Sequence, residues 1–189
     1  MMMLLSVIYL GLRASLILVA AVVLGLSVSL AKHQVIGQVP AETGFSTFVG
    51  ASGFFVSAVG MAVLWFDRIN ESIMIVLDAT MSSFYLAAAI CLTLAMKNVS
   101  SCTSGDMPIQ YNRVTNKILS GGCIAVNKGL ECMHAVTADG KDLTPSRCEM
   151  ARTNYVFEYV GFVASVAMVF VGYLLARRGR GGTPTPSYH

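Results

Sequence analysis

The stretch IVLDATMSSFYLAAAICLTLAM, residues 75–96, decides the fold. At about 1.5 Å per residue, a helix of this length crosses the roughly 30 Å hydrocarbon core of a bilayer. Asp78 nevertheless lies within its first turns, and an ionised group in a span costs about 2.5–3.5 kcal/mol at mid-bilayer on insertion scales. Such a group usually faces the interior of a helix bundle and has a partner there. The stretch therefore predicts a membrane-spanning helix that belongs to a bundle.

The composition extends this prediction to the whole chain. Of its 189 residues, 55% are hydrophobic and only 12% are charged, against about 25% charged in a soluble domain. This balance excludes an ordinary globular protein. The predicted fold class is an all-α membrane protein, a four-transmembrane-helix bundle over residues 1–176. It has a loop at 97–154 and a disordered basic tail at 177–189, and its spans are 8–31, 45–66, 73–96 and 155–176.

The first span has a competing interpretation as a signal peptide. Its apolar run ends in Ser29-Leu30-Ala31, a small-x-small pattern typical of a cleavage site. However, the run from Ala14 exceeds the usual signal core of about 7–15 residues, and Arg13 lies far along for a basic segment. We therefore expect an uncleaved span.

The charges and cysteines bear on orientation. Five Lys and Arg residues lie on the side of the two termini and eight on the other, which argues against cytoplasmic termini. This rule weakens as loops approach about 60 residues, and the cluster Arg177, Arg178 and Arg180 after the last span is typical of a cytoplasmic stop. We expect cytoplasmic termini, with the arginines either contacting the anionic inner leaflet or serving topology alone.

Four of the five cysteines lie in the long loop: Cys102, Cys123, Cys132 and Cys148. An even set confined to one loop predicts two disulfides in an oxidising, extracellular environment. Reduced thiols are the alternative, and the spacing C-x8-C-x-H matches no common zinc site. A glycosylation sequon begins at Asn98, close to the end of the third span.

Arg13 and Asp78 are predicted to form an ion pair inside the membrane. Each lies five residues into its span from the same face, so the two reach a similar depth. The alternative is that Arg13 extends to the headgroups while Asp78 is protonated or bonded to a nearby hydroxyl. Glu158, near the outer end of the fourth span, is expected to be an interfacial acid within reach of Lys32, Lys97 and Arg152.

Small residues recur at four-residue spacing in every span. The plain interpretation is packing between helices of the chain, and the functional one is lateral association. The stripes are Ala21, Gly25 and Ser29; Gly53 and Ser57; Ala79, Ser83, Ala87 and Cys91; and Gly161 and Ser165. Aromatic residues near the span ends, among them Tyr9 and Tyr155, are expected at the membrane interface.

No catalytic constellation accompanies these features. No nucleotide-binding loop, metal motif or Ser-His-Asp order is visible, and the central parts of the spans hold no charge. The sequence predicts a protein that is not an enzyme, takes no cofactor and binds no nucleic acid.

Three segments resemble the fungal non-classical export protein family, four-span proteins of the MARVEL type. They are LDATMSSFYLAAAICLTLAM with the following KNVSSC, the loop segment YNRVTNKILSGG, and RCEMARTNYVFEYVGFVAS at the entry to the last span. About half of the chain is covered, whereas the first two spans match only in hydropathy. The resemblance implies a disulfide between Cys102 and Cys148, which leaves Cys123 and Cys132 as a second pair.

The resemblance also implies a function at the plasma membrane. It suggests an organiser of sterol- and sphingolipid-rich, eisosome-like patches that senses sphingolipids or aids unconventional export. The expected partners are membrane lipids and other membrane proteins, including further copies of the chain. Two alternatives stay open, a vesicle-trafficking or cargo-adaptor tetraspan and a small channel or transporter subunit that uses Asp78.

Overall fold

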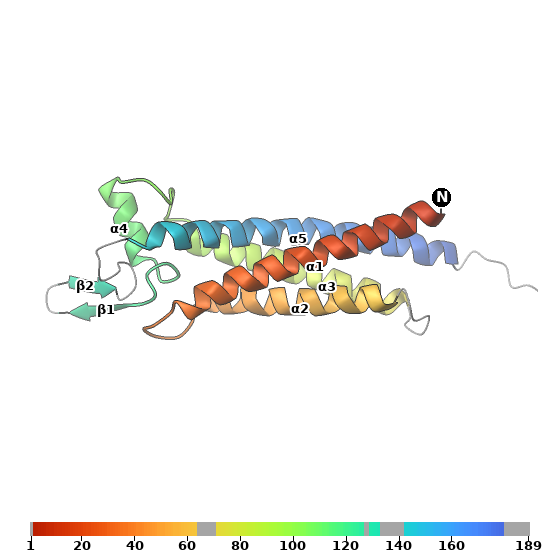
Figure 1. The fold of residues 1–189 in the computed structure, drawn as a ribbon, viewed down its shortest axis with the longest axis horizontal. Helices are drawn as coiled ribbons and strands as arrows, with labels where there is room; N and C mark the ends of the chain where they lie inside the picture. The colour runs from red at the N-terminus through yellow and green to blue at the C-terminus, as the bar shows by residue number, and fades with distance from the viewer. Residues whose placement is uncertain (1, 64–70, 127–128, 133–141, 180–189) are drawn as a thin grey trace, which may run out of the picture.

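The computed structural model describes residues 2–63, 71–126, 129–132 and 142–179. Four long helices run side by side (Figure 1): α1 (Met2–Lys32), α2 (Ala41–Val63), α3 (Glu71–Met96) and α5 (Thr144–Gly179). The short helix α4 (Met107–Thr115) and the antiparallel hairpin of β1 (Cys123–Val126) and β2 (Gly129–Cys132) lie together at one end, far from the N-terminus. All four long helices are long and apolar enough to cross a membrane, so the predicted four-helix membrane bundle is confirmed.

The helices form a ring in which each packs on two neighbours. α3 packs most extensively against α5 and α1 against α2, and the smaller α1–α5 and α2–α3 contacts close the bundle. α1 and α3 therefore face each other across the bundle, as do α2 and α5. Any side-chain bond between α1 and α3 has to pass through the bundle interior.

All four long helices begin before the hydrophobic runs predict, α1 and α5 by the largest margins. α1 begins at Met2 and α5 at Thr144, eleven residues before the expected start of the fourth span. The first turns of α5 are polar, so a search for apolar runs does not find them, but local chemistry supports a helix there. Proline is tolerated in the first turn of a helix, where Pro145 lies. Asp142, just before the helix, accepts a hydrogen bond from the backbone N–H of Thr144 through Oδ1 over 2.8 Å. The end of the predicted second span, residues 64–66, lies outside the described residues.

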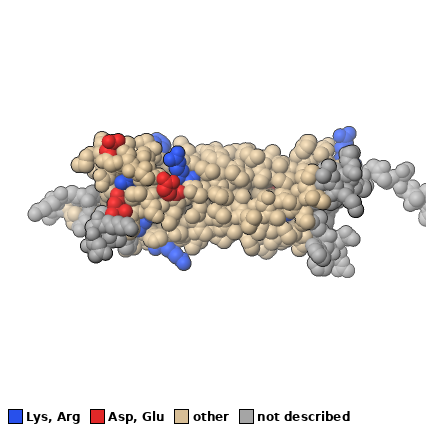
Figure 2. All heavy atoms as spheres, turned by 45° about the horizontal axis from the view of Figure 1, so that its top comes forward, with Lys and Arg blue, Asp and Glu red and all other residues tan. Residues whose placement is uncertain are grey.

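The outer surface of the bundle is apolar. Large hydrophobic side chains point outward along its length, among them Leu18 and Phe55, each 68% exposed, and Phe170, 62% exposed. On the face drawn in Figure 2, charged side chains gather toward the two ends and leave the middle bare. A bilayer accommodates such a surface, because the hydrocarbon core is as apolar as the side chains it contacts.

Backbone contacts dock the α1–α2 link onto the long loop. The amides of Val35 and Ile36 both donate to the carbonyl of Gly121, over 2.9 and 3.1 Å. Gly122 follows with φ near +99°, and a Cβ there would overlap the Ile36 backbone. A glycine is therefore required at this crossing. The link and the loop together form one head on the end of the bundle.

Candidate functional site

The bundle interior holds a bidentate ion pair between Arg13 on α1 and Asp78 on α3. The guanidinium donates to both carboxylate oxygens, Nη1 to Oδ1 and Nη2 to Oδ2, each over 2.7 Å. The Arg13 side chain is 0% exposed and that of Asp78 only 6%. Parallel double hydrogen bonds of this kind are the strongest arrangement for an arginine and a carboxylate. The structure thus brings together the two residues that the sequence places at similar depth.

Tyr9 and Gly60 complete the surroundings of the guanidinium. The Tyr9 hydroxyl, one turn before Arg13 on α1, accepts from Nε over 3.2 Å and from Nη2 over 2.9 Å. On α2, a Cβ at Gly60 would collide with the guanidinium carbon, so the glycine provides the space that Arg13 occupies. Tyr9 was expected at the membrane interface, but it is buried because its hydroxyl accepts hydrogen bonds from Arg13. Its i, i+4 spacing from the arginine was the available signal.

The pair joins two helices that face each other across the bundle. Arg13 lies six residues after the start of the candidate span at Val7, and Asp78 six after the start at Ser72, about 9 Å along each helix. Removal of one partner from a buried pair typically costs about 3–5 kcal/mol, because the remaining charge is uncompensated. The pair therefore fixes the spacing and register of α1 against α3 at the end remote from the head.

A second polar group, Glu158 on α5, is buried on the head side of the bundle. It is 0% exposed, so the expectation of an interfacial acid near Lys32, Lys97 and Arg152 is wrong. Because α5 begins at Thr144, Glu158 lies well inside the helix, on the face turned toward α2 and α3. Asn154 Nδ2 donates to Glu158 Oε1 over 3.4 Å, and Ser46 on α2 is close, outside good hydrogen-bond geometry. Within the described ranges, Glu158 makes no ion pair.

Tyr85 on α3 forms the centre of the packing between three helices. Its ring is 1% exposed and packs in the space left by Gly161 on α5, where a Cβ would approach the ring carbons to 2.9 Å. Its hydroxyl lies over Gly53 on α2, where a Cβ would overlap the oxygen. Two glycines on facing helices thus accommodate one large side chain. The sequence identified both glycines as packing residues but not the tyrosine that lies between them.

The small residues divide into an inward and an outward set. Gly53, Ser57, Gly161 and Ser165 are buried between helices, as the packing interpretation requires. Six others are exposed on the outer surface, so the packing interpretation is wrong for them within this chain: Ala21, Gly25, Ala79, Ser83, Ala87 and Cys91. On α3 the buried face contains Asp78, and the next residue is turned by about 100° away from it. A shift of one residue therefore moves the stripe from the interior to the surface.

A disulfide ties the head to the last helix. Cys102, shortly after α3, bonds to Cys148 in the second turn of α5, with Cα atoms 5.4 Å apart. Both side chains are buried beside Leu92, Met96 and Leu119. Cys123 and Cys132 are direct cross-strand partners in the hairpin, and their pairing stays a prediction. Cys91, the fifth cysteine, is a free thiol exposed on the outer face of α3.

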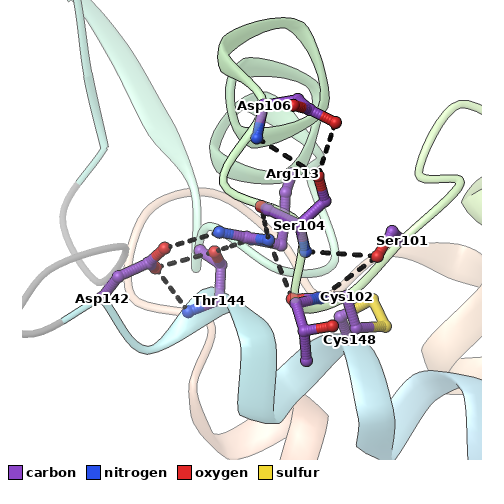
Figure 3. Close-up of polar contacts among 9 residues, drawn as sticks. Ser101, Cys102, Ser104, Asp106, Arg113, Asp142, Thr144 and Cys148 are labelled. Atoms are coloured by element: carbon purple, nitrogen blue, oxygen red, sulfur yellow. Dashed lines mark hydrogen bonds and ion pairs between the residues drawn. A yellow bond between two sulfur atoms is a disulfide. The ribbon is translucent and has the colours of Figure 1, made fainter.

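Arg113 holds the head together beside that disulfide (Figure 3). Although it lies in the loop, it is only 4% exposed. Its guanidinium donates to the carbonyl of Cys102 over 2.8 Å, to Thr144 Oγ1 over 2.8 Å and to Asp142 Oδ2 over 2.9 Å. Sequence reasoning treated Arg113 only as a loop charge. Its partners lie up to 31 positions away, and no local pattern marks them.

The environment of Asp142 favours its charged form. Partial burial alone would raise its pKa, but hydrogen bonds from Thr144 and Arg113 outweigh burial and hold the pKa below the ordinary value of 3.8. The carboxylate is therefore ionised at neutral pH and pairs with Arg113. This pair links the start of α5 to α4.

Further contacts dock the head on the helix ends. Arg147 donates to the carbonyl of Leu119 over 2.9 Å, and Asn116 Nδ2 donates to the carbonyl of Ala95 on α3 over 2.9 Å. Asn98 is exposed, two residues past the end of α3. At the opposite end of α5, Arg177 is exposed. The side chain of Arg178 and all of Arg180 lie outside the described residues.

The ion pair, the inward glycines and the disulfide-linked head all stabilise a bundle of membrane-spanning helices. A comparison with known families also identifies a membrane domain. The family model for MARVEL, the membrane-associating domain, matches residues 6–171. No curated protein and no solved structure matches the chain. The matched segment includes all four candidate spans except the last turns of α5, together with the head. The chain therefore belongs to the family of MARVEL membrane-associating domains.

Proposed function

We propose that the chain is a non-enzymatic organiser of the plasma membrane that associates laterally in sterol- and sphingolipid-rich, eisosome-like patches. Membership of the MARVEL family supports a membrane-associating role. The observation that carries the proposal is the outward stripe on α3, formed by Ala79, Ser83, Ala87 and Cys91. Small side chains let the backbones of two membrane helices approach closely, and the resulting packing favours association.

The proposed orientation has the head outside the cell and both termini in the cytoplasm. The Cys102–Cys148 bond supports it, because disulfides persist in oxidising compartments and are rare in the cytosol. Arg177, exposed at the other end of α5, would then meet the anionic inner leaflet, where each basic residue contributes about 1 kcal/mol. Sphingolipid sensing and help in unconventional export belong to the same proposal and rest on the family resemblance in the loop and last span.

Imaging of a fluorescently tagged chain tests the organiser role. The proposal expects a patchy distribution over the cell surface that changes when sphingolipid synthesis is inhibited. A uniform distribution that ignores the inhibitor would contradict it. Accumulation in internal vesicles instead of the surface would favour the trafficking alternative.

Cysteine cross-linking tests the stripe directly, because Cys91 is itself a member. In native membranes, a short bis-maleimide should join two chains through Cys91 and yield a dimer band. Ala87→Leu, which places a bulky group in the stripe, should reduce that band. Val160→Leu is the matched control, since Val160 is 48% exposed on the outer face of α5. Equal cross-linking in both variants would contradict association through the stripe.

The transport alternative is less favoured by the geometry around Asp78. Both of its carboxylate oxygens accept hydrogen bonds from Arg13, so the arginine already balances the negative charge that would attract a cation. The bridge also crosses the bundle from α1 to α3 and lies where a central pathway would run. An ion flux in proteoliposomes that disappears with Asp78→Asn would overturn this preference.

A further inference from the structure

A pocket of about 210 Å³ opens where α3 and α5 meet the head. Its apolar wall consists of Met96, Val99, Tyr155 and the disulfide between Cys102 and Cys148. Figure 3 shows this disulfide against the first turns of α5, beneath the loop that Arg113 holds. The disulfide therefore fixes this part of the wall covalently.

Two cations line the same pocket. Lys97 and Arg152 are both exposed, and in the part of the chain that the structure describes their side chains make no ion pair. Glu149, one turn before Arg152, is exposed and does not line the pocket. The pocket thus offers positive charge without an acidic partner, directly beside an apolar wall. Such a combination complements an anion that is joined to an apolar body.

The depth of the pocket in the bilayer indicates which kind of anion it could bind. Met96 is the last residue of the candidate span on α3, and Lys97 is the first residue beyond it. The pocket therefore lies at the boundary between hydrocarbon and headgroups, where lipid phosphates are found. A free phosphate would satisfy the two cations but would leave the apolar wall unused. A lipid satisfies both, with its phosphate at Lys97 and Arg152 and its glycerol or acyl portion against Met96 and Tyr155.

We propose that this pocket binds the phosphate group of a phosphate-bearing lipid from the leaflet on the side of the head. Arg152 supplies planar paired donors and Lys97 a point charge, both suited to phosphate oxygens. Ser100, also in the lining, adds a hydroxyl donor. The inference deepens the proposed organising role, because it names the lipid class that the chain would gather, and it rests on that role only in placing the chain in a membrane.

Native mass spectrometry of the full chain in delipidating detergent tests the pocket. The probes are phosphatidylinositol, phosphatidylcholine, diacylglycerol and inorganic phosphate, each titrated separately. We expect phosphatidylinositol to bind most tightly, and diacylglycerol, which lacks phosphate, at least tenfold more weakly. The double variant Lys97→Gln/Arg152→Gln should lose at least tenfold in affinity for phosphatidylinositol, which corresponds to about one charge-assisted hydrogen bond.

The control removes the same charge elsewhere. Lys32→Gln/Lys117→Gln alters two exposed cations outside the pocket and should bind phosphatidylinositol like the parent chain. Equal losses in both double variants, equal binding of diacylglycerol, or equally tight binding of inorganic phosphate would each overturn the proposal. Unchanged thermal melting of both double variants shows that they are folded.

This test is separate from that of the organising role. If the chain binds phosphatidylinositol in the pocket but spreads uniformly over the cell, the lipid site is supported and the organising role is contradicted. If the chain forms patches but shows no measurable phospholipid binding, the organising role is supported and the lipid site is contradicted.

Discussion

The intramembrane ion pair permits the sharpest quantitative prediction. Asp78→Asn leaves the Arg13 guanidinium buried without a counter-charge, and Arg13→Gln leaves the Asp78 carboxylate in the same position. Each single variant should lose about 3–5 kcal/mol of unfolding free energy, the usual cost of breaking one partner of a buried pair. The double variant Arg13→Gln/Asp78→Asn removes both charges and leaves two neutral amides in their place. It should recover most of that loss.

The coupling energy follows from this cycle. If the double variant loses about 2 kcal/mol, the two single losses exceed it by at least about 4 kcal/mol. Neutral hydrogen bonds between membrane helices average only about 0.6 kcal/mol, so a coupling of this size requires the charges. The assay is reversible unfolding of the purified chain in mixed micelles, followed by circular dichroism.

A matched exposed pair provides the control. Lys117 and Glu42 are joined over 2.8 Å, but the Lys117 side chain is 63% exposed. Lys117→Gln should therefore cost less than about 1 kcal/mol. Losses at Arg13 and Asp78 that add to within about 0.5 kcal/mol would refute the pairing, because independent sites behave in that way.

Three further predictions concern packing and the head. Gly161→Val should lower the melting temperature strongly, because its side chain would overlap the Tyr85 ring, whereas Gly25→Ala, with nothing within 4 Å of the added carbon, should leave it unchanged or slightly raised. Cys102→Ser opens a loop of 46 residues and should lower the free energy of unfolding by about 4 kcal/mol on the chain-entropy model. This difference is measured by unfolding without reductant, and it should disappear when reductant is added to both proteins. Because the pKa of Asp142 lies below its unfolded value, its contribution to stability is complete at neutral pH and is lost as the pH falls through the lowered pKa. Arg113→Gln should raise that pKa and move the acid-induced loss of amide protection in the head to higher pH, and an unchanged midpoint in hydrogen exchange would contradict the role of Arg113.

Much of the architecture was predictable because it depends on local properties of the chain. A run of about 20 apolar residues has to satisfy its backbone internally in lipid, so it forms a helix wherever it occurs. The depth of Arg13 and Asp78 follows from counting residues along two such runs. The long polar start of α5 was missed for the same reason, since it carries no apolar run and is helical through its capping and its contacts with the head.

Only the tertiary structure decided which way side chains face and which residues they contact. The stripe at Ala79 and Ser83 was visible in the sequence, but whether it faces the bundle or the lipid depends on a rotation of α3 of about 100°, one residue of helix. Glu158 was assigned to the interface because its depth was counted from the wrong starting point, and its burial reflects the face that α5 turns toward α2 and α3. Arg113 acquired its role from residues brought near it by folding, across separations of up to 31 positions. Hydrophobicity along one chain sets which segments enter the membrane, whereas facing and pairing depend on the packing of all four helices at once, which no single segment encodes.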